Sequence, residues 1–244
     1  MTARVAVWSG PRNISTAMMR AWEARGDCAV VDEPLYAHYL LVTGVDHPGR
    51  EEVLARHETD WRRVVEALVG PAPRGAAIFY QKHMAHHLVG GIRRDWIASL
   101  RNALLIRQPR AMVASLARVI PNPGIEETGL PQLERLDAWL GERTGAAAPV
   151  IDARDVLLDP PGTLRALCLS LGVGYTEKML AWRAGGRATD GVWARHWYAN
   201  VERSTGFAPY APPEIDPPAR LTPLIRACDA IYERLAGRRL NPQP

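Results

Sequence analysis

Short apolar runs alternate with amphipathic stretches along most of the chain. Each run predicts a strand, and the stretches between the runs carry apolar residues at helical spacing. The predicted strands are residues 3–8, 28–31, 76–81, 102–106 and 149–151. The predicted helices are residues 15–25, 50–69, 92–100, 110–119, 131–143, 163–171, 176–182 and 218–236. This alternation predicts a three-layer α/β fold, with a central parallel sheet of about five strands flanked by helices.

The pattern changes beyond Ala184. Residues 185–213 are rich in loop-forming residues and carry a group of closely spaced aromatic residues: Trp193, Trp197, Tyr198, Phe207 and Tyr210. Neither an internal repeat nor a flexible linker interrupts the chain. We therefore expect a single domain over residues 1–244, in which residues 185–244 form a C-terminal wrapping or lid segment.

Composition narrows the class of protein. The chain has 244 residues, of which 47% are hydrophobic and 23% charged, as in globular proteins. Its three cysteines are widely spaced and form no CxxC pair, which predicts buried, reduced thiols rather than disulfides or a zinc ribbon. No apolar stretch approaches the roughly 18–20 residues of a membrane helix, and no signal-peptide pattern opens the chain. We expect a cytoplasmic protein with no membrane partner, and a homo-oligomer is possible.

The charge of the chain favours a small anionic ligand. The formal net charge is +4, and Lys82 and Lys178 are the only lysines among 30 basic residues. The planar guanidinium of arginine matches phosphate groups well. The arginines are scattered, without the basic run that marks nucleic-acid binding. We therefore expect no nucleic-acid partner.

A turn with hydroxyl residues lies between the first predicted strand and its helix. Its candidate ligand-binding residues are Gly10, Pro11, Arg12, Asn13, Ser15 and Thr16. Free backbone N–H groups and the positive helix end favour an anion here, and Arg12 adds a fixed charge. In the alternative interpretation, Ser15 only caps the helix. No lysine follows a glycine, so the motif is not that of an ATP- or GTP-hydrolysing P-loop.

A second candidate phosphate site follows the fourth predicted strand. Arg107 stands at the carboxyl end of that strand, which is the edge where open α/β sheets bind ligands. Ser115 lies eight residues later, within the following helix. A guanidinium and a hydroxyl that converge in this way suit a phosphate monoester. A surface arginine with an unrelated helical serine is the structural alternative.

Lys82 follows the third predicted strand and stands beside a group of histidines. As one of two lysines in an arginine-rich chain, it hints that an ammonium group is required there. The histidines are His83, His86 and His87. Their i, i+3, i+4 spacing permits Zn²⁺ ligation, although no cysteine or carboxylate is close in sequence. Surface or core histidines without a chemical role are the other alternative.

Asp32 and Glu33 follow the second predicted strand. A carboxylate at this point emerges at the same sheet edge as Arg12 and Lys82. Asp32 is also a candidate cap for the next helix, and a plain strand-end cap is the alternative interpretation of Glu33.

Together, the two phosphate motifs resemble those of the sulfotransferases that use 3′-phosphoadenosine-5′-phosphosulfate (PAPS). In that family, a strand–loop–helix with a Pro-Lys/Arg-Ser-Gly-Thr-like sequence holds the 5′-phosphosulfate, and residues 11–16 match it. An arginine at a strand end and a serine eight residues later hold the 3′-phosphate, as Arg107 and Ser115 would here. The likeness covers roughly residues 1–170 and is closest to divergent bacterial sulfotransferase-like proteins.

The resemblance implies a P-loop-like fold and a PAPS-dependent sulfotransferase. A sulfuryl group would pass from PAPS to a hydroxyl or amine of a small-molecule or carbohydrate acceptor, without a metal. Arg12 and Lys82 would neutralise charge on the departing phosphate. In related carbohydrate sulfotransferases a glutamate in the region of Glu33 is the proposed base, and His86 is the second candidate.

The late segment and the first helix are compared with the family less directly. Arg187 and Trp193 loosely resemble a segment that closes over the 3′-phosphate and adenine. Ile14 replaces the loop glycine, so we expect that turn to differ. Ala17 stands where the cytosolic enzymes have a tryptophan that stacks on adenine, a role that Trp193 or Trp197 would take here.

Three other functions compete with this interpretation. A small-molecule kinase shares the P-loop-like fold but needs the missing Walker lysine. A non-catalytic nucleotide-binding module fits an altered loop. A pyridoxal-phosphate enzyme would need a Schiff-base lysine, which only Lys82 or Lys178 can supply.

Overall fold

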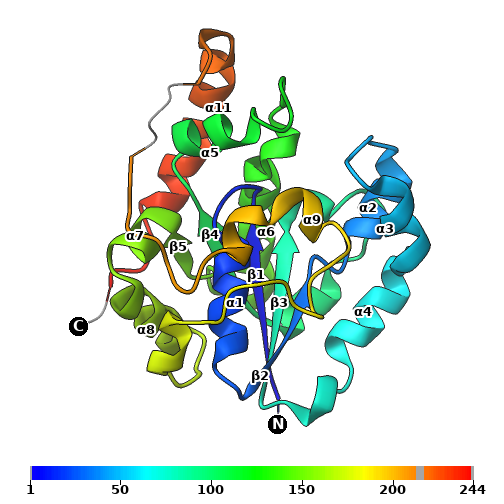
Figure 1. Ribbon diagram of the computed structural model, residues 1–244, viewed down its shortest axis with the longest axis vertical. Helices are drawn as coiled ribbons and strands as arrows, with labels where there is room; N and C mark the ends of the chain where they lie inside the picture. Colours follow the sequence, from blue (N-terminus) through cyan, green and yellow to red (C-terminus); the bar gives the residue numbers. More distant parts are fainter. Residues whose placement is uncertain (1, 213–216, 243–244) are drawn as a thin grey trace.

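The computed structural model describes residues 2–212 and 217–242, so residues 213–216 and 243–244 of the C-terminal segment lie outside the described residues. Parallel strands form one five-stranded sheet in the order β2-β3-β1-β4-β5. The strands are β1 (Ala3–Ser9), β2 (Cys28–Asp32), β3 (Ile78–Met84), β4 (Arg101–Ile106) and β5 (Val150–Asp152). The predicted three-layer α/β fold with a parallel sheet of about five strands is confirmed (Figure 1).

Helices follow or connect the strands. The α-helices are α1 (Ser15–Ala24), α2 (Tyr36–Thr43), α3 (Arg50–Arg56), α4 (Trp61–Val69), α5 (Pro109–Leu116), α6 (Leu130–Thr144), α7 (Ala153–Leu158), α8 (Pro160–Ser170), α9 (Ala194–Trp197), α10 (Ala199–Glu202) and α11 (Thr222–Ala236). The 3₁₀ turns are η1 (Pro73–Gly75), η2 (Ala85–His87), η3 (Asp95–Ser99), η4 (Glu126–Thr128), η5 (Glu177–Leu180) and η6 (Ala219–Leu221).

Several elements differ from the prediction. The helix expected over residues 50–69 is two helices, because His57 is extended and Asp60 caps a new helix by accepting from the Arg62 N–H at 2.9 Å. The stretches 92–100 and 176–182 contain 3₁₀ turns instead of α-helices. The third strand continues to Met84, so Lys82 lies within the strand instead of after it.

The two faces of the sheet pack against different layers. Alternation along β1 sends Val5 and Val7 toward α1, α7 and α8, and sends Ala6 and Trp8 toward α4, α5, α6 and α11. All four side chains are fully buried. Because α11 contributes to the second of these cores, the end of the described chain is packed into the domain.

The strand register brings the carboxyl ends of the sheet to one edge. Asp32 pairs with Lys82, and Ser9 pairs with Met84 on one side and Leu105 on the other. Chain segments that follow the strands therefore meet at this edge, as in other open parallel sheets. In Figure 1, α9 lies across the same end of β1 and β3, where the loops converge.

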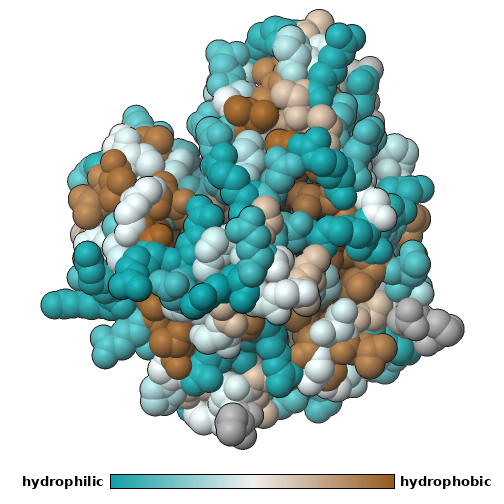
Figure 2. All heavy atoms as spheres, turned by 180° about the vertical axis from the view of Figure 1, so that it is seen from behind, coloured by the Kyte–Doolittle hydropathy of each residue, from teal (hydrophilic) through white to brown (hydrophobic). Residues whose placement is uncertain are grey.

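The face of the molecule drawn in Figure 2 carries no continuous apolar patch. In Figure 2, hydrophilic side chains cover most of the visible face, and apolar ones form separate small groups. Within residues 2–212 and 217–242, no helix combines the length and hydropathy that crossing a bilayer requires.

Candidate active site

A cavity of about 420 Å³ lies at this edge of the sheet, within the range of small-molecule sites. The loop between β1 and α1, the ends of β2 and β3, helices α2 and α5, and the segment from α9 to Ala208 all contribute to its wall. The predicted site residues that line it are Pro11, Arg12, Asn13, Ser15, Thr16, Glu33, Lys82, His86, Arg107 and Ser115. The fold thus brings together most of the residues that the sequence singled out.

The loop before α1 leaves the start of that helix open to a ligand. Ile14 occupies the N-cap position with φ 58° and makes no side-chain capping bond. The first backbone N–H groups of α1 therefore donate to no capping side chain. Ser15 is already inside the helix, and its expected alternative role as a simple cap is not what the structure shows. The left-handed φ of Ile14 and of Arg12 (62°) is strained for residues with a Cβ, and such strain concentrates at functional sites.

Gly10 is required by a close approach of two backbones. A Cβ at this position would overlap the Thr128 carbonyl oxygen, at the end of η4. Gly10 is not among the residues that line the cavity in the described chain. Because Gly10 has no side chain, the loop can pack against the residues that precede α6.

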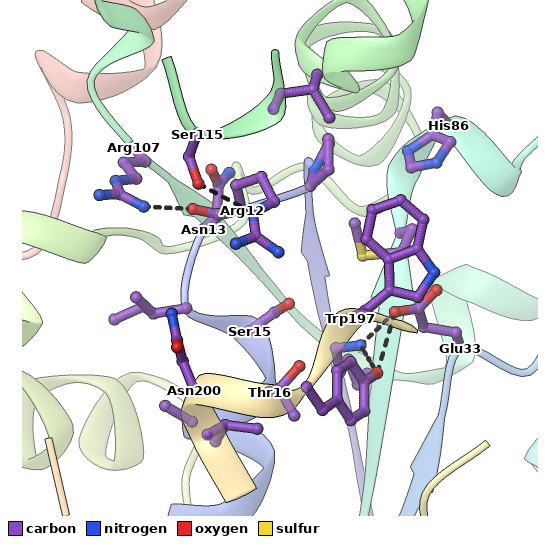
Figure 3. A pocket seen from close by; sticks show the side chains of 18 of the residues that line it. Arg12, Asn13, Ser15, Thr16, Glu33, His86, Arg107, Ser115, Trp197 and Asn200 are labelled. Atoms are coloured by element: carbon purple, nitrogen blue, oxygen red, sulfur yellow. Dashed lines mark hydrogen bonds and ion pairs between the residues drawn. The ribbon is translucent and has the colours of Figure 1, made fainter. Parts of the chain in front are cut away.

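Two arginines and a serine converge beside the loop. Arg12 Nε donates to Ser115 Oγ at 3.0 Å, and Arg107 Nη1 donates to the Arg12 carbonyl oxygen at 2.6 Å (Figure 3). Burial and the neighbouring Arg12 lower the pKa of Arg107, and burial and Arg118 lower the pKa of Arg12. Neither guanidinium forms an ion pair with a carboxylate of the described residues. An anion bound here would relieve the repulsion between these cations.

Lys82 has a different environment. Its ammonium donates to Asp32 Oδ1 at 2.8 Å, to Tyr198 Oη at 2.7 Å and to Glu33 Oε1. Burial lowers the pKa of Lys82, but the charges of Asp32 and Glu33 outweigh burial and leave this pKa raised. All three N–H donors are therefore occupied within the protein.

Glu33 lies at the junction between this network and the cavity. Its side chain is 12% exposed, and its backbone has φ 40°, another strained conformation. Burial raises the pKa of Glu33, while Lys82 opposes the shift. Asp32 does not cap α2; it accepts from Tyr198 at 2.7 Å and from the Gly191 N–H at 3.3 Å. Asp32 and Glu33 thus connect the segment of residues 191–198 to the carboxyl edge of the sheet.

The three predicted histidines do not form one group. His83 is 1% exposed and stacks on Trp8 with ring centroids 4.0 Å apart, away from the cavity. His86 and His87 line the cavity. Burial lowers the pKa of His86 and of His83 to about 3. Among the described residues, no set of three His, Cys, Asp or Glu side chains is arranged to hold a metal ion.

Two residues expected from the late segment lie elsewhere. Trp193 is 2% exposed and donates through Nε1 to Tyr198 Oη at 3.1 Å. Arg187 pairs with Glu23 at 3.2 Å. Neither Arg187 nor Trp193 is among the residues that line the cavity in the described chain. Arg187 thus connects the late segment to α1, and Trp193 connects to Tyr198 within that segment.

The cavity also contains residues that the sequence did not single out as site residues: Tyr36, Tyr39, His47, Glu127, Tyr198 and Asn200. Tyr36 and Tyr39 belong to α2, which was not expected as a helix. Tyr198 belongs to the aromatic group noted in the tail, and that grouping was the available signal for it.

Comparison with known proteins places these features in a family. Residues 3–238 match the family described as "Sulfotransferase domain". Two curated relatives, branched-chain-amino-acid aminotransferase-like proteins 1 and 2 of Arabidopsis thaliana, are 38% and 34% identical over 82% and 93% of the chain. The chain spans only 36% and 40% of the length of these relatives.

Solved structures share the fold at low identity. The sulfotransferase domain of the olefin synthase of Synechococcus PCC 7002 matches with a TM-score of 0.57 and 14% identity, over 95% of this chain and 96% of that one. A sulfotransferase from Alicyclobacillus acidocaldarius matches with a TM-score of 0.54 and 14% identity, over 98% of each chain. The fold is therefore the P-loop-like fold of these proteins, and the chain belongs to the sulfotransferase family.

Proposed function

We propose that this protein transfers a sulfuryl group from PAPS to a hydroxyl or amine of a small-molecule acceptor. The observation that carries the proposal is the pair of cavity arginines, Arg12 and Arg107, which stand beside Ser115 without a carboxylate partner among the described residues. Family membership narrows the anion to a sulfuryl donor. A bisphosphorylated nucleotide supplies the negative charge that this end of the cavity lacks.

The residues around the loop fit the parts of such a donor. The open start of α1, with Ser15 and Thr16, would bind the 5′-phosphosulfate, and Arg107 with Ser115 would bind the 3′-phosphate. Phe207 is the better candidate for the adenine than Trp193 or Trp197. Phe207 lines the cavity and packs in the same core as Ala17 of α1, whereas Trp193 does not line the cavity and Trp197 lies near Glu33 (Figure 3).

The transfer step assigns separate roles to Glu33 and Arg12. The acceptor oxygen or nitrogen forms a bond to sulfur while the bond from sulfur to the phosphate oxygen breaks. Glu33 takes the acceptor proton, since its raised pKa makes it a stronger base than an ordinary carboxylate. Arg12 stabilises the charge that develops on the departing phosphate. Burial lowers the pKa of His86 to about 3, which leaves it a poor proton acceptor.

The names of the plant relatives do not transfer to this cavity. A pyridoxal-phosphate enzyme needs a lysine that is free to form a Schiff base. Lys82 is held by three acceptors, and Lys178 is exposed on η5. Sulfuryl transfer needs no Schiff-base lysine, and the residues proposed for it, Arg12, Glu33 and Arg107, line the cavity.

Calorimetric titration with 3′-phosphoadenosine-5′-phosphate and with ATP, side by side, tests the proposal. We expect tighter binding of the 3′-phosphorylated nucleotide, because Arg107 and Ser115 are placed for its 3′-phosphate. Equal or tighter binding of ATP would count against a PAPS enzyme and favour the kinase alternative.

Glu33→Gln tests the assigned base. The substitution keeps the shape of the side chain, so nucleotide affinity should stay close to that of the unmodified protein. Release of 3′-phosphoadenosine-5′-phosphate from PAPS should slow by about 10²- to 10⁴-fold, the effect of a missing general base. Near-normal turnover would move the role to another residue, with His86 tested next.

A further inference from the structure

The cavity has two ends with different chemistry. Arg12, Arg107 and Ser115 form one end (Figure 3, left). The other end, here called the aromatic end, carries His86, Trp197 and Glu33 at the right of the same view. The aromatic end consists of Tyr36, Tyr39, His47, His86, His87 and Trp197. The proposed donor accounts for the arginine end and leaves the aromatic end for the acceptor.

The rings of the aromatic end form one continuous wall. His87 stacks on Tyr36 and on Tyr39 with centroids 4.8 Å apart in each pair. His47 links this group to Trp197, with centroids 5.9 Å from Tyr36 and 6.2 Å from Trp197. These side chains come from α2, the loop after it, η2 and α9. Aromatic walls assembled in this way bind organic cations through the negative faces of their rings.

Negative charges outnumber positive ones at this end. Glu33 and Glu127 both line the cavity, and the charge of Glu127 acts on both Tyr39 and His47. Lys82 is a single positive charge shared between two carboxylates, Asp32 and Glu33.

The histidines add no compensating positive charge. Burial lowers the pKa of His47, lowers that of His86 to about 3, and holds that of His87 well below its usual range. All three rings are therefore neutral at pH 7, and the aromatic end keeps its excess of negative charge.

Two buried ring atoms at this end have no partner in the protein. Nδ1 of His86 and Nδ1 of His87 are buried without a hydrogen bond to any described residue. His87 is 2% exposed, and both side chains line the cavity. Buried polar atoms are normally paired, so these two nitrogens are an exception within the wall of the aromatic end.

We propose that the acceptor carries a positively charged ammonium group, which the aromatic end binds through its rings and through Glu127, while a hydroxyl of the same molecule faces Glu33. This inference rests on the proposed sulfuryl transfer and names its acceptor class: small amino alcohols in the broad sense. The cation supplies the counter-charge that Glu127 lacks among the described residues. A neutral phenol would fill the same space and leave Glu127 without a counter-charge.

Binding of a matched pair of probes tests the charge requirement directly. Choline and 3,3-dimethylbutan-1-ol have the same shape and differ in the positive charge, because a quaternary carbon replaces the nitrogen. Calorimetry, with and without saturating 3′-phosphoadenosine-5′-phosphate, should show choline binding about 10-fold tighter or more. Equal binding, tighter binding of the neutral alcohol, or no binding of either at millimolar concentration would overturn the proposal.

A pair of glutamate variants locates the effect. Glu127→Gln should remove most of the preference for choline, whereas binding of the neutral alcohol should change little. Glu126→Gln is the matched control, since Glu126 is the preceding residue of η4, is exposed and pairs with Arg135. Loss of the preference in both variants, or in neither, would contradict a role for Glu127.

The sulfuryl transfer and the cationic acceptor are tested by different measurements. If the nucleotide titration fails, the sulfotransferase assignment falls, whatever the alcohols do. If the nucleotide binds and choline has no advantage over its neutral counterpart, the sulfuryl transfer stands and the cationic acceptor is wrong.

Discussion

Two kinds of cation line the same cavity and differ in their partners. Lys82 is enclosed by two carboxylates and a tyrosine hydroxyl. Arg12 and Arg107 contact a serine and a backbone carbonyl, with no carboxylate of the described residues in ion-pair distance. From sequence alone, Arg12 and Lys82 were expected to share one task, the neutralisation of the departing phosphate. In the structure their partners differ. Lys82 forms ion pairs with Asp32 and Glu33, whereas Arg12 contacts no carboxylate of the described residues.

The two environments imply different roles for these charges. A charge that is paired inside the protein is already neutralised, so its removal harms the fold by leaving the partner charge buried alone. A half-buried charge with no carboxylate in ion-pair distance is held at a cost in stability, which a ligand of opposite charge offsets. Lys82 belongs to the first kind and the two arginines to the second.

Lys82→Met should have the largest effect, and on stability. Asp32 and Glu33 would remain buried without their cation, and breaking a buried pair from one side costs about 3–5 kcal/mol. Urea unfolding followed by circular dichroism measures the change. Lys178→Met, which alters the other, exposed lysine, is the control and should stay within about 0.5 kcal/mol. A stable Lys82→Met protein would erase the distinction.

Arg107→Ala should show the reverse pattern. Affinity for 3′-phosphoadenosine-5′-phosphate should fall about 10- to 150-fold, which is the loss of about 1.5–3 kcal/mol from a charged hydrogen bond. Stability should change by no more than about 1 kcal/mol, because the lost bond to the Arg12 carbonyl is offset by relief of repulsion between the arginines. Arg93→Ala, at an exposed arginine, is the control for affinity. Unchanged affinity would contradict the assignment of the 3′-phosphate site.

His83 is a third kind of buried group, one that stays neutral. Its contribution to the free energy of unfolding depends on pH. Burial lowers the pKa of His83 to about 3 in the folded protein, against about 6.5 when unfolded. The unfolded chain therefore binds the proton first, and stability is lost as pH falls below about 6.5. Between pH 6.5 and 5 this histidine should account for about 1.5 kcal/mol of lost unfolding free energy.

Denaturant unfolding of the protein and of His83→Phe at several pH values checks this prediction. The phenyl ring can keep the stacking on Trp8 but cannot titrate. The variant should lose less stability on acidification than the unmodified protein does. Parallel pH curves for the two proteins would show that His83 is not the titrating group.

Tyr198→Phe should have the smallest effect of the set. It removes one of three acceptors around Lys82 and leaves Trp193 Nε1 without its partner, while the charge balance with Asp32 and Glu33 remains. We expect a loss of about 1 kcal/mol in thermal or urea unfolding. A loss as large as that of Lys82→Met would mean that the hydroxyl, and not the charge pairing, holds the network together.

Local sequence patterns predicted the arginine end of the cavity well. The loop of residues 11–16 adjoins its strand and helix, and Arg107 and Ser115 are eight residues apart on adjacent elements. A strand end and the next helix start lie close together in any parallel α/β unit, so short-range spacing is enough to place them. The five strands were found for the same reason, because each is a compact apolar run.

The aromatic end and the Lys82 network depend on contacts that no local pattern encodes. Tyr198 reaches Lys82 across 116 residues of chain. Helix α2 is eight residues long and apolar on most sides, so it shows no helical periodicity that would have placed Tyr36 and Tyr39. Asp32 resembled a cap by position, whereas tertiary contacts with the tail decide its role.

The contact between Gly10 and the end of η4 has a consequence for protein engineering. Gly10 begins the loop that we propose binds the donor, and Gly129 is packed so closely that an added Cβ would lie 2.9 Å from the Gly10 Cα. Glu127, which faces the aromatic end, is two residues before Gly129. A redesign of acceptor preference can therefore vary the exposed positions Pro121, Asn122 and Glu126, while Thr128, Gly129 and Gly10 must be kept together. A larger side chain at Gly10 or Gly129 would move both the loop before α1 and the segment that carries Glu127. The proposed donor and acceptor sites would then shift together, and so would the alignment of the two reacting groups.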